Sequence, residues 1–420
     1  MSDCCSGDRL LTLADALTAV LSTIQPICDT ETAPLLDAYG RVLAADLIAR
    51  LDVPPHDNSA MDGYALHLAD LKQDQPTRLP VIGQSLAGHP YLEPVPCGAT
   101  VQITTGAVLP DGPDAVVMQE ECRIAPDGGW IEVEPSTAIR LKTGENIRRR
   151  GEDVSANTIL LPRGLRLRPQ DVSLAAGQGI ATLEVVRPLR VAVASTGDEL
   201  YPPGQVLPPG AIYESNRYVL IGLLRRLGCM VTDMHILRDD RSMILSSLRD
   251  AVLSHDVLLT SGGISVGTAD LVKDIIAELG KIEFWRLAVK PGKPVAVGWI
   301  DNCMILGLPG NPVSVVVTYL MLVRPLLLKR MGSEAAEPLR LRALADFQFR
   351  RKPGRREWLR ARLSLNAEQQ LIVSIYHTNS SGALSSLSWA DGLVELPEDC
   401  VGVASGDEVM YLPFSGFGIG

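Results

Sequence analysis

The chain lacks the features typical of nucleic-acid-binding, secreted and membrane-spanning proteins. Its formal net charge at pH 7 is -10, whereas proteins that bind a nucleic-acid backbone need clustered Lys and Arg to displace phosphate counterions. The start of the chain has no basic segment followed by an apolar stretch and a small-residue cleavage site. The longest apolar run, Val313 to Val323, is shorter than the roughly 20 residues that span a bilayer. We therefore expect a cytoplasmic protein with neither a nucleic acid nor a membrane as partner.

Residue spacings that bind zinc or form disulfide frameworks are also missing. The eight cysteines include no CxxC pair, and the six histidines form no HxH or HExxH. Hydrophobic residues make up 46% of the chain and charged residues 21%, close to the balance of globular proteins. A chain of 420 residues with this composition is expected to form roughly two to four folded domains.

The first part of the chain alternates between helical and β-rich patterns. Apolar residues recur at helical spacing near the start, at Leu13, Leu17, Val20, Leu21 and Ile24, after a Thr12 and Asp15 pair that approximates a capping box. Further helices are expected over Asp37 to Asp46 and Pro169 to Gly177. Between Val53 and Thr143 the sequence consists of short β-rich pieces interrupted by Gly and Pro. This pattern predicts a small β-domain inserted into a helical one.

Strands and helices alternate regularly in the middle of the chain. Strands are expected over 190–196, 229–237, 256–260, 294–300 and 303–307, and helices over 215–227, 242–253 and 271–279. Such alternation indicates a parallel, doubly wound α/β sheet, whose ligands bind beyond the carboxyl ends of the strands. From about Glu334 the helical signal fades and β-rich segments return, which predicts a C-terminal β-barrel or sandwich.

Three loops that follow predicted strands of this sheet have the composition of anion-binding loops. They are STGDEL (195–200), TSGGISVGTAD (260–270) and GLPGNPVS (307–314). Glycine lets backbone amides approach an anion, and a helix N-terminus opened by Asn311 and Pro312 favours negative charge. Each loop alone would be read as a tight turn with a cap. Together they favour a phosphorylated ligand, with candidate contacts at Thr196, Gly197, Ser261, Gly262, Gly263, Pro309, Gly310, Asn311 and Pro312.

Carboxylates beside these loops are candidates for binding Mg²⁺. They are Asp198, Glu199, Asp239, Asp240 and Asp270. Next to a phosphate-binding loop, carboxylates commonly hold Mg²⁺, which bridges phosphate oxygens and neutralises charge as a phosphoanhydride breaks. The alternative is that Asp270 caps the following helix and that Asp239 and Asp240 begin the helix at Ser242.

Two basic segments provide candidate sites for a smaller anion. Lys290 and Lys293 lie on a turn with Pro291, Gly292 and Pro294, which would fix two ammonium groups well enough to bind a tetrahedral dianion. The second segment, Arg148 to Arg150, is followed by acidic residues, and a solvated ion-pair surface is the alternative there.

The order of the motifs identifies the family that the chain resembles. DVPPHDNSAMDGYAL (52–66), ITTGAVLPDGPDAVVMQEE (103–121), ENIRRRGEDV (145–154), STGDEL, SGGISVGTAD, KPGKP and LPGNPVS occur in this order. The series resembles the molybdopterin molybdenumtransferases, the family of bacterial MoeA and the gephyrin E-domain. The match extends over nearly the whole chain, including SSGALSSLSWADGLVELPED near the C-terminus.

The resemblance implies four domains in an elongated homodimer. The expected domains are a discontinuous helical linker domain (1–52 and 145–188), the inserted β-domain (53–144), the α/β molybdopterin-binding domain (189–333) and the C-terminal β-barrel (334–420). The active site would lie between the α/β domain of one subunit and the β-domain of the other. The catalytic residues implied by the family are Asp62, Thr105, Asp153, Glu199, Asp239 and Asp270.

The resemblance also implies a molybdate pocket formed by Lys290, Lys293, Pro294, Ser314, Arg360 and Ser381. All of these except proline supply hydrogen-bond donors, as an oxyanion requires. Three positions depart from the family pattern: His56 stands where Phe is usual, Arg286 where Lys is frequent, and SSG replaces another small-residue spacing. The last departure leaves Ser380 and Ser381 as alternatives in the pocket.

The implied activity is insertion of molybdate into adenylylated molybdopterin, with Mg²⁺-dependent release of AMP. Transient contacts with the molybdopterin adenylyltransferase and with apo-molybdoenzymes would follow from that role. A molybdopterin adenylyltransferase-like enzyme is one alternative, although its core alone would need neither residues 1–188 nor 334–420. A scaffold without catalysis is another, but it would be expected to lose carboxylates and lysines that this chain retains.

Overall fold

The computed structural model describes residues 10–262, 271–333 and 337–419, in which the chain forms two compact units. Unit 1 consists of Met1–Ala44, Gly164–Arg168 and Leu183–Gly420, and unit 2 of Ala45–Arg163 and Pro169–Thr182. Gly263 and Asp270, both predicted site residues, lie outside the described residues. The division into four domains stays a prediction.

Unit 1 is built on a six-stranded sheet with the order β16-β13-β17-β21-β20-β18. Its strands are β13 (Arg190–Thr196), β16 (Met230–Leu237), β17 (Val257–Ser261), β18 (Lys281–Arg286), β20 (Pro294–Ile300) and β21 (Cys303–Leu308). The first four strands in this order are parallel, which confirms the doubly wound α/β fold. The parallel expectation is wrong for β20, which pairs antiparallel with β21, and the antiparallel edge strand β18 was not predicted at all. Only residues 301 and 302 separate β20 from β21, too few for the crossover that parallel strands need.

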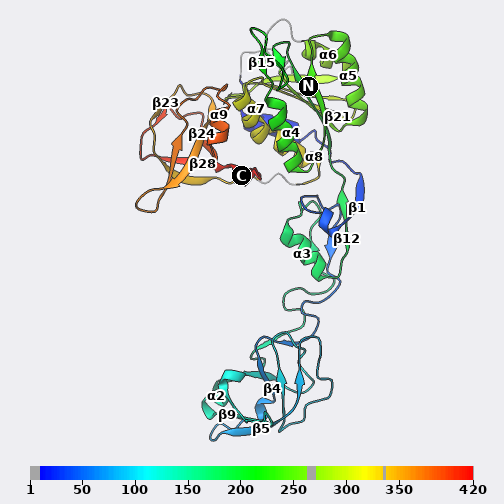
Figure 1. Cartoon of the computed structure of the whole chain (residues 1–420), viewed down its shortest axis with the longest axis vertical. Helices are drawn as coiled ribbons and strands as arrows, with labels where there is room; N and C mark the ends of the chain where they lie inside the picture. Colours follow the sequence, from blue (N-terminus) through cyan, green and yellow to red (C-terminus); the bar gives the residue numbers. More distant parts are fainter. Residues whose placement is uncertain (1–9, 263–270, 334–336, 420) are drawn as a thin grey trace. The chain divides into compact units, whose positions relative to one another are not determined.

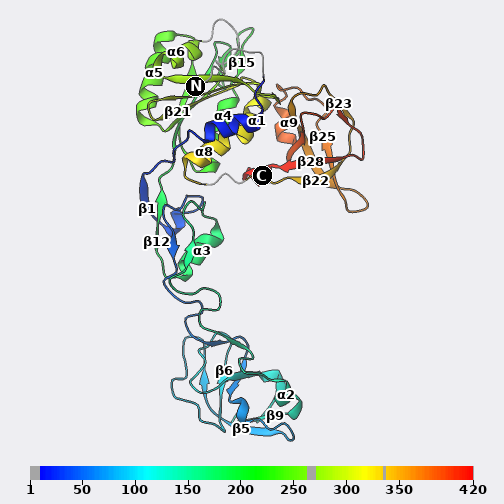
Figure 2. The same cartoon turned by 180° about the vertical axis from the view of Figure 1, so that it is seen from behind.

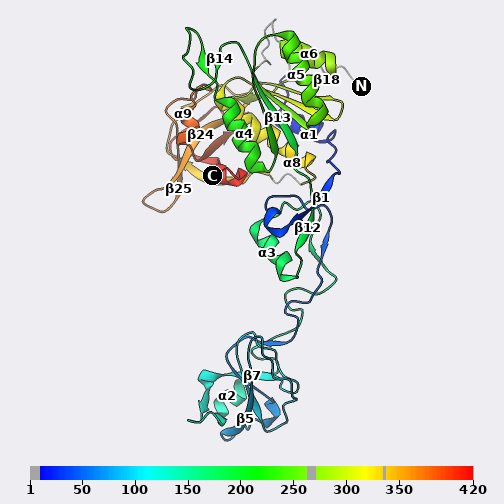
Figure 3. The ribbon, with the colours of Figure 1, turned by 45° about the vertical axis from the view of Figure 1, so that its right-hand side comes forward.

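Helices cover both faces of this sheet (Figure 1). On one face lie α1 (Leu13–Leu21), α4 (Asn216–Leu227) and the helix from α7 (Pro312–Thr318) to α8 (Arg324–Arg330); on the other lie α5 (Arg241–Ser254) and α6 (Leu271–Leu279). Alternate residues of β13 point to opposite faces of the sheet. Val191 and Val193 belong to the core formed with α1, α4 and the α7–α8 helix, and Ala192 and Ala194 to the core formed with α5 and α6. Figure 2 shows α1 beside α8, and Figure 3 shows α4 against β13.

The apolar run from Val313 to Val323, expected to form a buried helix, is helical and buried, but the helix continues past Val323 through Arg324 and Pro325. Residues 312–330 form one helix, with a π-helical turn at Tyr319–Val323 between α7 and α8. Length and composition alone would allow this helix to cross a membrane, but 78% of its most apolar window is buried inside the protein. It is therefore a core helix of unit 1.

Of the two helices expected in the first 46 residues, the first forms and the second does not. Thr12 caps α1, and its hydroxyl accepts a hydrogen bond from Asp15 N, as predicted. The helix expected over Asp37 to Asp46 does not form. A 3-10 turn (Leu35–Asp37) is followed by Gly40 at φ +72°, and Leu43 then forms a β-bridge to Val185. Next to it β1 (Thr30–Pro34) pairs with β12 (Thr182–Val186).

The predicted C-terminal β-barrel is confirmed. Five strands close on themselves in the order β22-β28-β26-β24-β25, because β24 pairs with β26 and β22 pairs with β25. They are β22 (Leu341–Ala345), β24 (Arg356–Leu365), β25 (Leu371–Ile375), β26 (Gly392–Leu396) and β28 (Glu408–Pro413). The shorter elements of unit 1 are β14 (Leu200–Tyr201), β15 (Ile212–Tyr213), β19 (Val289–Lys290), β23 (Phe349–Arg350), β27 (Gly402–Val403), α9 (Ser385–Trp389) and a 3-10 turn (Phe414–Phe417).

Unit 2 contains the predicted β-rich segment and the predicted short helix α3 (Pro169–Gly177). Its main sheet has the order β7-β4-β6-β5-β9-β8, formed by β4 (Gly63–Leu66), β5 (Thr77–Ser85), β6 (Thr100–Ile103), β7 (Ala115–Met118), β8 (Cys122–Ile124) and β9 (Trp130–Val133). The remaining elements are β2 (Leu47–Ile48), β3 (Asn58–Ser59), β10 (Ile147–Arg148), β11 (Ile159–Leu161), α2 (Pro135–Arg140) and 3-10 turns at Leu68–Asp70 and Gln119–Glu121.

Candidate active site

The described residues of the three predicted anion-binding loops, which for the second loop are residues 260–262, meet at the carboxyl ends of β13, β17 and β21. Gly262 N donates a hydrogen bond to Leu308 O at 3.1 Å, and a Cβ on Gly262 would lie 2.7 Å from Thr196 O. Gly262 also has φ +86°, which disfavours any other residue there. The structure thus brings Thr196, Ser261 and the end of β21 together, as predicted from the strand order.

Asn216, which the sequence did not single out, connects two of these loops. Its Nδ2 donates to Gly310 O at 2.6 Å and to Ser261 Oγ at 2.9 Å, while its Oδ1 is buried and has no hydrogen-bond partner among the described residues. A buried acceptor of this kind is costly unless a donor reaches it. Asn216 is the first residue of α4, far in sequence from both loops, so no local motif could have identified it.

Three carboxylates gather beside the first loop. Asp239 N donates to an Asp198 carboxylate oxygen at 3.3 Å. Burial, followed by the negative charges of Asp198 and Glu199, raises the pKa of Asp239 above its usual value. A Cβ on Gly197 would lie 2.5 Å from the Glu199 carboxylate, so that carboxylate packs over the glycine. A cation such as Mg²⁺ would reduce the repulsion between these carboxylates, whose oxygens are the ligands that Mg²⁺ prefers.

The structure nevertheless shows no complete metal centre. In the described part of the chain, no group of three or more His, Cys, Asp or Glu side chains could hold a metal ion, and Asp270 lies outside that part. Asp240 caps α5, where its carboxylate accepts hydrogen bonds from Met243 N at 2.9 Å and Ser242 Oγ at 2.6 Å. The capping alternative is therefore the observed role of Asp240, and the Mg²⁺ site stays a prediction.

The turn that carries the two lysines packs against α7. Gly292 has φ +104°, and a Cβ there would lie 2.5 Å from Thr318 Oγ1, so only glycine fits. Lys290 Nζ forms an ion pair at 2.8 Å with Glu357 of the barrel strand β24, and Lys293 O accepts a hydrogen bond from Leu287 N. This rigid turn therefore lies beside the first residues of the core helix, where Ser314 is buried.

Arg360 holds the loop that contains Ser380 and Ser381. Its side chain is buried, and burial lowers its pKa below the usual value. Arg360 Nη2 donates to Thr378 O at 2.8 Å and Ser380 O at 3.2 Å. Val313 N, in the first turn of α7, donates to Ser381 O at 3.0 Å. The predicted molybdate residues from the barrel and from the core helix are thus brought together by backbone contacts.

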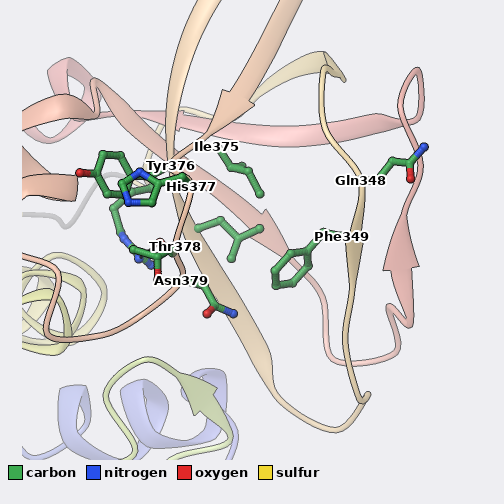
Figure 4. Close-up of a pocket in the computed structure, with 9 residues that line it drawn as sticks. Gln348, Phe349, Ile375, Tyr376, His377, Thr378 and Asn379 are labelled. Atoms are coloured by element: carbon green, nitrogen blue, oxygen red, sulfur yellow. Dashed lines mark hydrogen bonds between the residues drawn. The ribbon is translucent and has the colours of Figure 1, made fainter.

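Arg360 also lines a pocket of about 320 Å³ in the C-terminal barrel (Figure 4). Tyr376, His377, Thr378 and Asn379 line one part of this pocket, and Phe349 lies across from them. The Tyr376 and His377 rings contact each other with centroids 4.2 Å apart. The buried arginine therefore lines this pocket and also holds the serine loop that follows Asn379.

Unit 2 contains a second candidate group, around Asp62. One Asp62 carboxylate oxygen accepts hydrogen bonds from Thr105 N at 2.6 Å and from Thr105 Oγ1 at 2.8 Å. These bonds, the backbone one first, hold the pKa of Asp62 below its usual value. Asp153 N donates to Val53 O at 2.9 Å. No hydrogen bond in the described residues joins the Asp153 carboxylate to Asp62 or Thr105, so the structure brings together two of the three.

The basic segment at Arg148 to Arg150 forms ion pairs within unit 2. Arg149 lies 2.6 Å from Asp57, and Arg150 lies 2.6 Å from Asp52. The ion-pair alternative is therefore confirmed for these two arginines, although their partners are not the neighbouring acids.

Comparison with known proteins gives the family. Three family models match consecutive segments: the MoeA N-terminal region (domain I and II) at residues 11–179, a probable molybdopterin binding domain at 192–329, and the MoeA C-terminal region (domain IV) at 342–414. A molybdopterin molybdenumtransferase of Haemophilus influenzae is 38% identical over 97% of this chain and 99% of its own length. The chain belongs to the MoeA family of molybdopterin molybdenumtransferases.

Other members of the MoeA family agree with this assignment. Molybdopterin molybdenumtransferase 2 of Mycobacterium tuberculosis is 36% identical over 93% of this chain and 96% of its own length. The crystal structure of the molybdopterin biosynthesis MoeA protein from Pyrococcus horikoshii is 31% identical, has a TM-score of 0.81, and covers 96% of this chain and 100% of that one. The chain is thus a transferase of molybdenum cofactor biosynthesis.

Proposed function

We propose that the protein inserts molybdate into adenylylated molybdopterin and releases AMP with the help of Mg²⁺. The observation that carries this proposal is the convergence of a Lys290–Lys293 turn, the start of α7 and the Arg360-held serine loop in one part of unit 1. In the same unit, the described residues of three loops suited to phosphate lie at one edge of the sheet. An enzyme that joins an oxyanion to a phosphorylated pterin needs both features.

The chemistry assigned to these residues is binding and charge stabilisation. Two thiols of the pterin replace two molybdate oxygens, each of which leaves as hydroxide after taking a thiol proton. Water cleaves the phosphoanhydride, and AMP departs. Lys290 and Lys293 would hold molybdate by charge-assisted hydrogen bonds, and the Ser314 hydroxyl would donate a further one. Mg²⁺, when bound near Glu199 and Asp239, would neutralise charge on the phosphates.

A homodimer is part of the proposal. Asp62 and Thr105 belong to unit 2, and the phosphate loops belong to unit 1. By resemblance to the family, Asp62 of one subunit would serve the loops of the other. The cytoplasmic location and the transient contacts with the adenylyltransferase and apo-molybdoenzymes stay predictions of the same account.

The two alternative functions explain less of the chain. An adenylyltransferase-like enzyme would need only the α/β core, yet family models also match the segments before and after it. A scaffold without catalysis would not need Asp62 held in its charged form by Thr105 or Lys290 fixed by a buried acid.

The proposal is tested by incubating the purified protein with adenylylated molybdopterin, molybdate and Mg²⁺, followed by addition of an apo-molybdoenzyme. Activation of that enzyme is expected only when all three components are present. Formation of adenylylated molybdopterin from ATP would instead support the adenylyltransferase alternative, and absence of any conversion would support the scaffold.

A further inference from the structure

Glu357 is a buried acid shared by two cations. Its side chain is 3% exposed, with Oε1 2.8 Å from Lys290 Nζ and Oε2 3.4 Å from Arg351 Nε. A buried carboxylate is unfavourable unless it is paired. Neither Glu357 nor Arg351 belongs to the residues expected to bind substrate.

The strand pairing fixes this arrangement. β19 pairs in parallel with β24, and Lys290 stands opposite Glu357 in the register. Arg351 is anchored in turn by Leu396 O and Pro397 O, which accept hydrogen bonds from its Nη1 at 3.3 and 3.1 Å. The Arg351 side chain is 3% exposed, whereas that of Lys290 is 37% exposed. The Glu357 and Arg351 side chains are therefore fixed in the protein interior, and the Lys290 side chain extends from Glu357 toward solvent.

We infer that Glu357 is a positioning residue that holds the Lys290 ammonium where molybdate binds. This inference rests on the proposed function of Lys290. An unrestrained lysine side chain samples many rotamers, so fixing its ammonium in advance reduces the entropy lost on binding an anion. The two cations outweigh the single carboxylate, and the group keeps a net positive charge that attracts a dianion.

Glu395 provides a matched control in the same barrel. It is 8% exposed and also lies between two cations, Arg340 at 2.8 Å and Arg356 at 3.3 Å. Neither of these arginines belongs to the predicted site. Glu395→Gln therefore reproduces the loss of a buried carboxylate in the barrel without changing the partner of Lys290.

The test is a molybdate titration at saturating adenylylated molybdopterin for the full-length wild type, Glu357→Gln, Glu395→Gln, Lys290→Ala and the double variant Lys290→Ala/Glu357→Gln. We expect Glu357→Gln to raise the half-saturating molybdate concentration by about threefold to tenfold with little change in kcat, which separates substrate binding from chemistry. Glu395→Gln should leave it unchanged. In the Lys290→Ala background, Glu357→Gln should add nothing, because its effect passes through the lysine.

The outcomes distinguish this inference from the proposed function. If Lys290→Ala raises the molybdate requirement and Glu357→Gln does not, the positioning role is overturned and the oxyanion site stands. Additive effects in the double variant also overturn it, since they indicate a general structural role. If Lys290→Ala has no effect, the oxyanion site is wrong and the inference fails with it. Should Glu357→Gln not fold, Glu357→Asp keeps a negative charge beside Arg351 while withdrawing from Lys290, and the same increase is expected.

Discussion

Lys293 and Arg360 contribute to the proposed oxyanion pocket in different ways. A charge-assisted hydrogen bond contributes about 1.5 to 3 kcal/mol, or about tenfold to a hundredfold in affinity. We expect Lys293→Ala to raise the molybdate concentration for half-maximal cofactor formation by about that factor, while calorimetric pterin binding changes much less. Arg360→Ala should have at least this effect, because the guanidinium also holds Thr378 O and Ser380 O.

Arg362 is the control for both substitutions. It lies on the same strand, and its guanidinium donates to Trp389 O at 2.6 Å rather than to the serine loop. Arg362→Ala is therefore expected to leave the molybdate requirement unchanged. Wild-type molybdate dependence in both Lys293→Ala and Arg360→Ala would place the oxyanion pocket elsewhere.

Thr105 tunes the ionisation of Asp62. Its backbone N–H and its hydroxyl both donate to the carboxylate and lower the pKa of Asp62. Thr105→Val removes the hydroxyl bond and keeps the backbone bond, so we expect the pKa of Asp62 to rise part of the way toward its usual value. NMR titration of the Asp62 carboxyl carbon measures this directly. An unchanged pKa in the variant would show that the hydroxyl bond does not form in solution.

At the scale of elements, the sequence predicted helices correctly where their signals are local and wrongly where a segment pairs with a distant strand. The α1 cap, α3, α4 and α5 follow from apolar spacing and capping residues that act within a few positions. The helix expected over Asp37 to Asp46 is wrong because Gly40 adopts a positive φ and Leu43 bridges to a distant strand. Propensity is a weak guide where long-range pairing competes with it.

The candidate site divides in the same way. Thr196, Ser261 and Gly262 could be predicted, because residues that follow parallel strands meet at one edge of the sheet. Asn216 and Glu357 could not be predicted, because each contacts a residue that lies far away in the sequence: Asn216 contacts Gly310, and Glu357 contacts Lys290. Asp240 carried an ambiguous signal, since the same residue type suits a helix cap and a metal site.

Asp256 anchors the amino end of β17, away from the loops at its carboxyl end. Burial alone would raise the pKa of Asp256, but hydrogen bonds from Arg187 at 2.7 and 2.9 Å and from Arg190 N outweigh it and lower the pKa to about 2. A carboxyl group whose pKa is lower in the folded than in the unfolded state stabilises the protein at pH values above the unfolded-state pKa. This stabilisation is lost as the pH falls through the folded-state pKa. With the usual value near 3.8, the stabilisation should be complete above about pH 4 and disappear toward pH 2.

We therefore expect Asp256→Asn to lower the free energy of unfolding of unit 1 by roughly 2 to 3 kcal/mol at pH 7. Native-state hydrogen exchange of the β13 and β17 amides measures this quantity locally. The difference between variant and wild type should narrow below about pH 4. A difference that stays constant between pH 7 and pH 3 would mean that the ion pairs are not its source.

At the scale of the whole molecule, the proposed sharing of an active site between subunits makes a separate prediction. Asp62→Ala in unit 2 and Glu199→Ala in unit 1 should each abolish cofactor formation. Mixed and allowed to exchange subunits, the two inactive proteins should regain some activity, because one of the two sites in each heterodimer would carry no substitution. Mass spectrometry of tagged subunits confirms exchange. Confirmed exchange without recovered activity would contradict the shared site.

The central claim, that molybdate insertion is coupled to Mg²⁺-dependent cleavage of adenylylated molybdopterin, is tested most directly by measuring AMP released for each molybdenum cofactor formed. The account predicts equal amounts of the two products with molybdate and Mg²⁺ present, and loss of both in EDTA. It also predicts that Glu199→Ala, whose carboxylate packs over Gly197 in the first loop, forms neither product while keeping the wild-type fold. Cofactor formation without AMP, or undiminished turnover in EDTA, would contradict it.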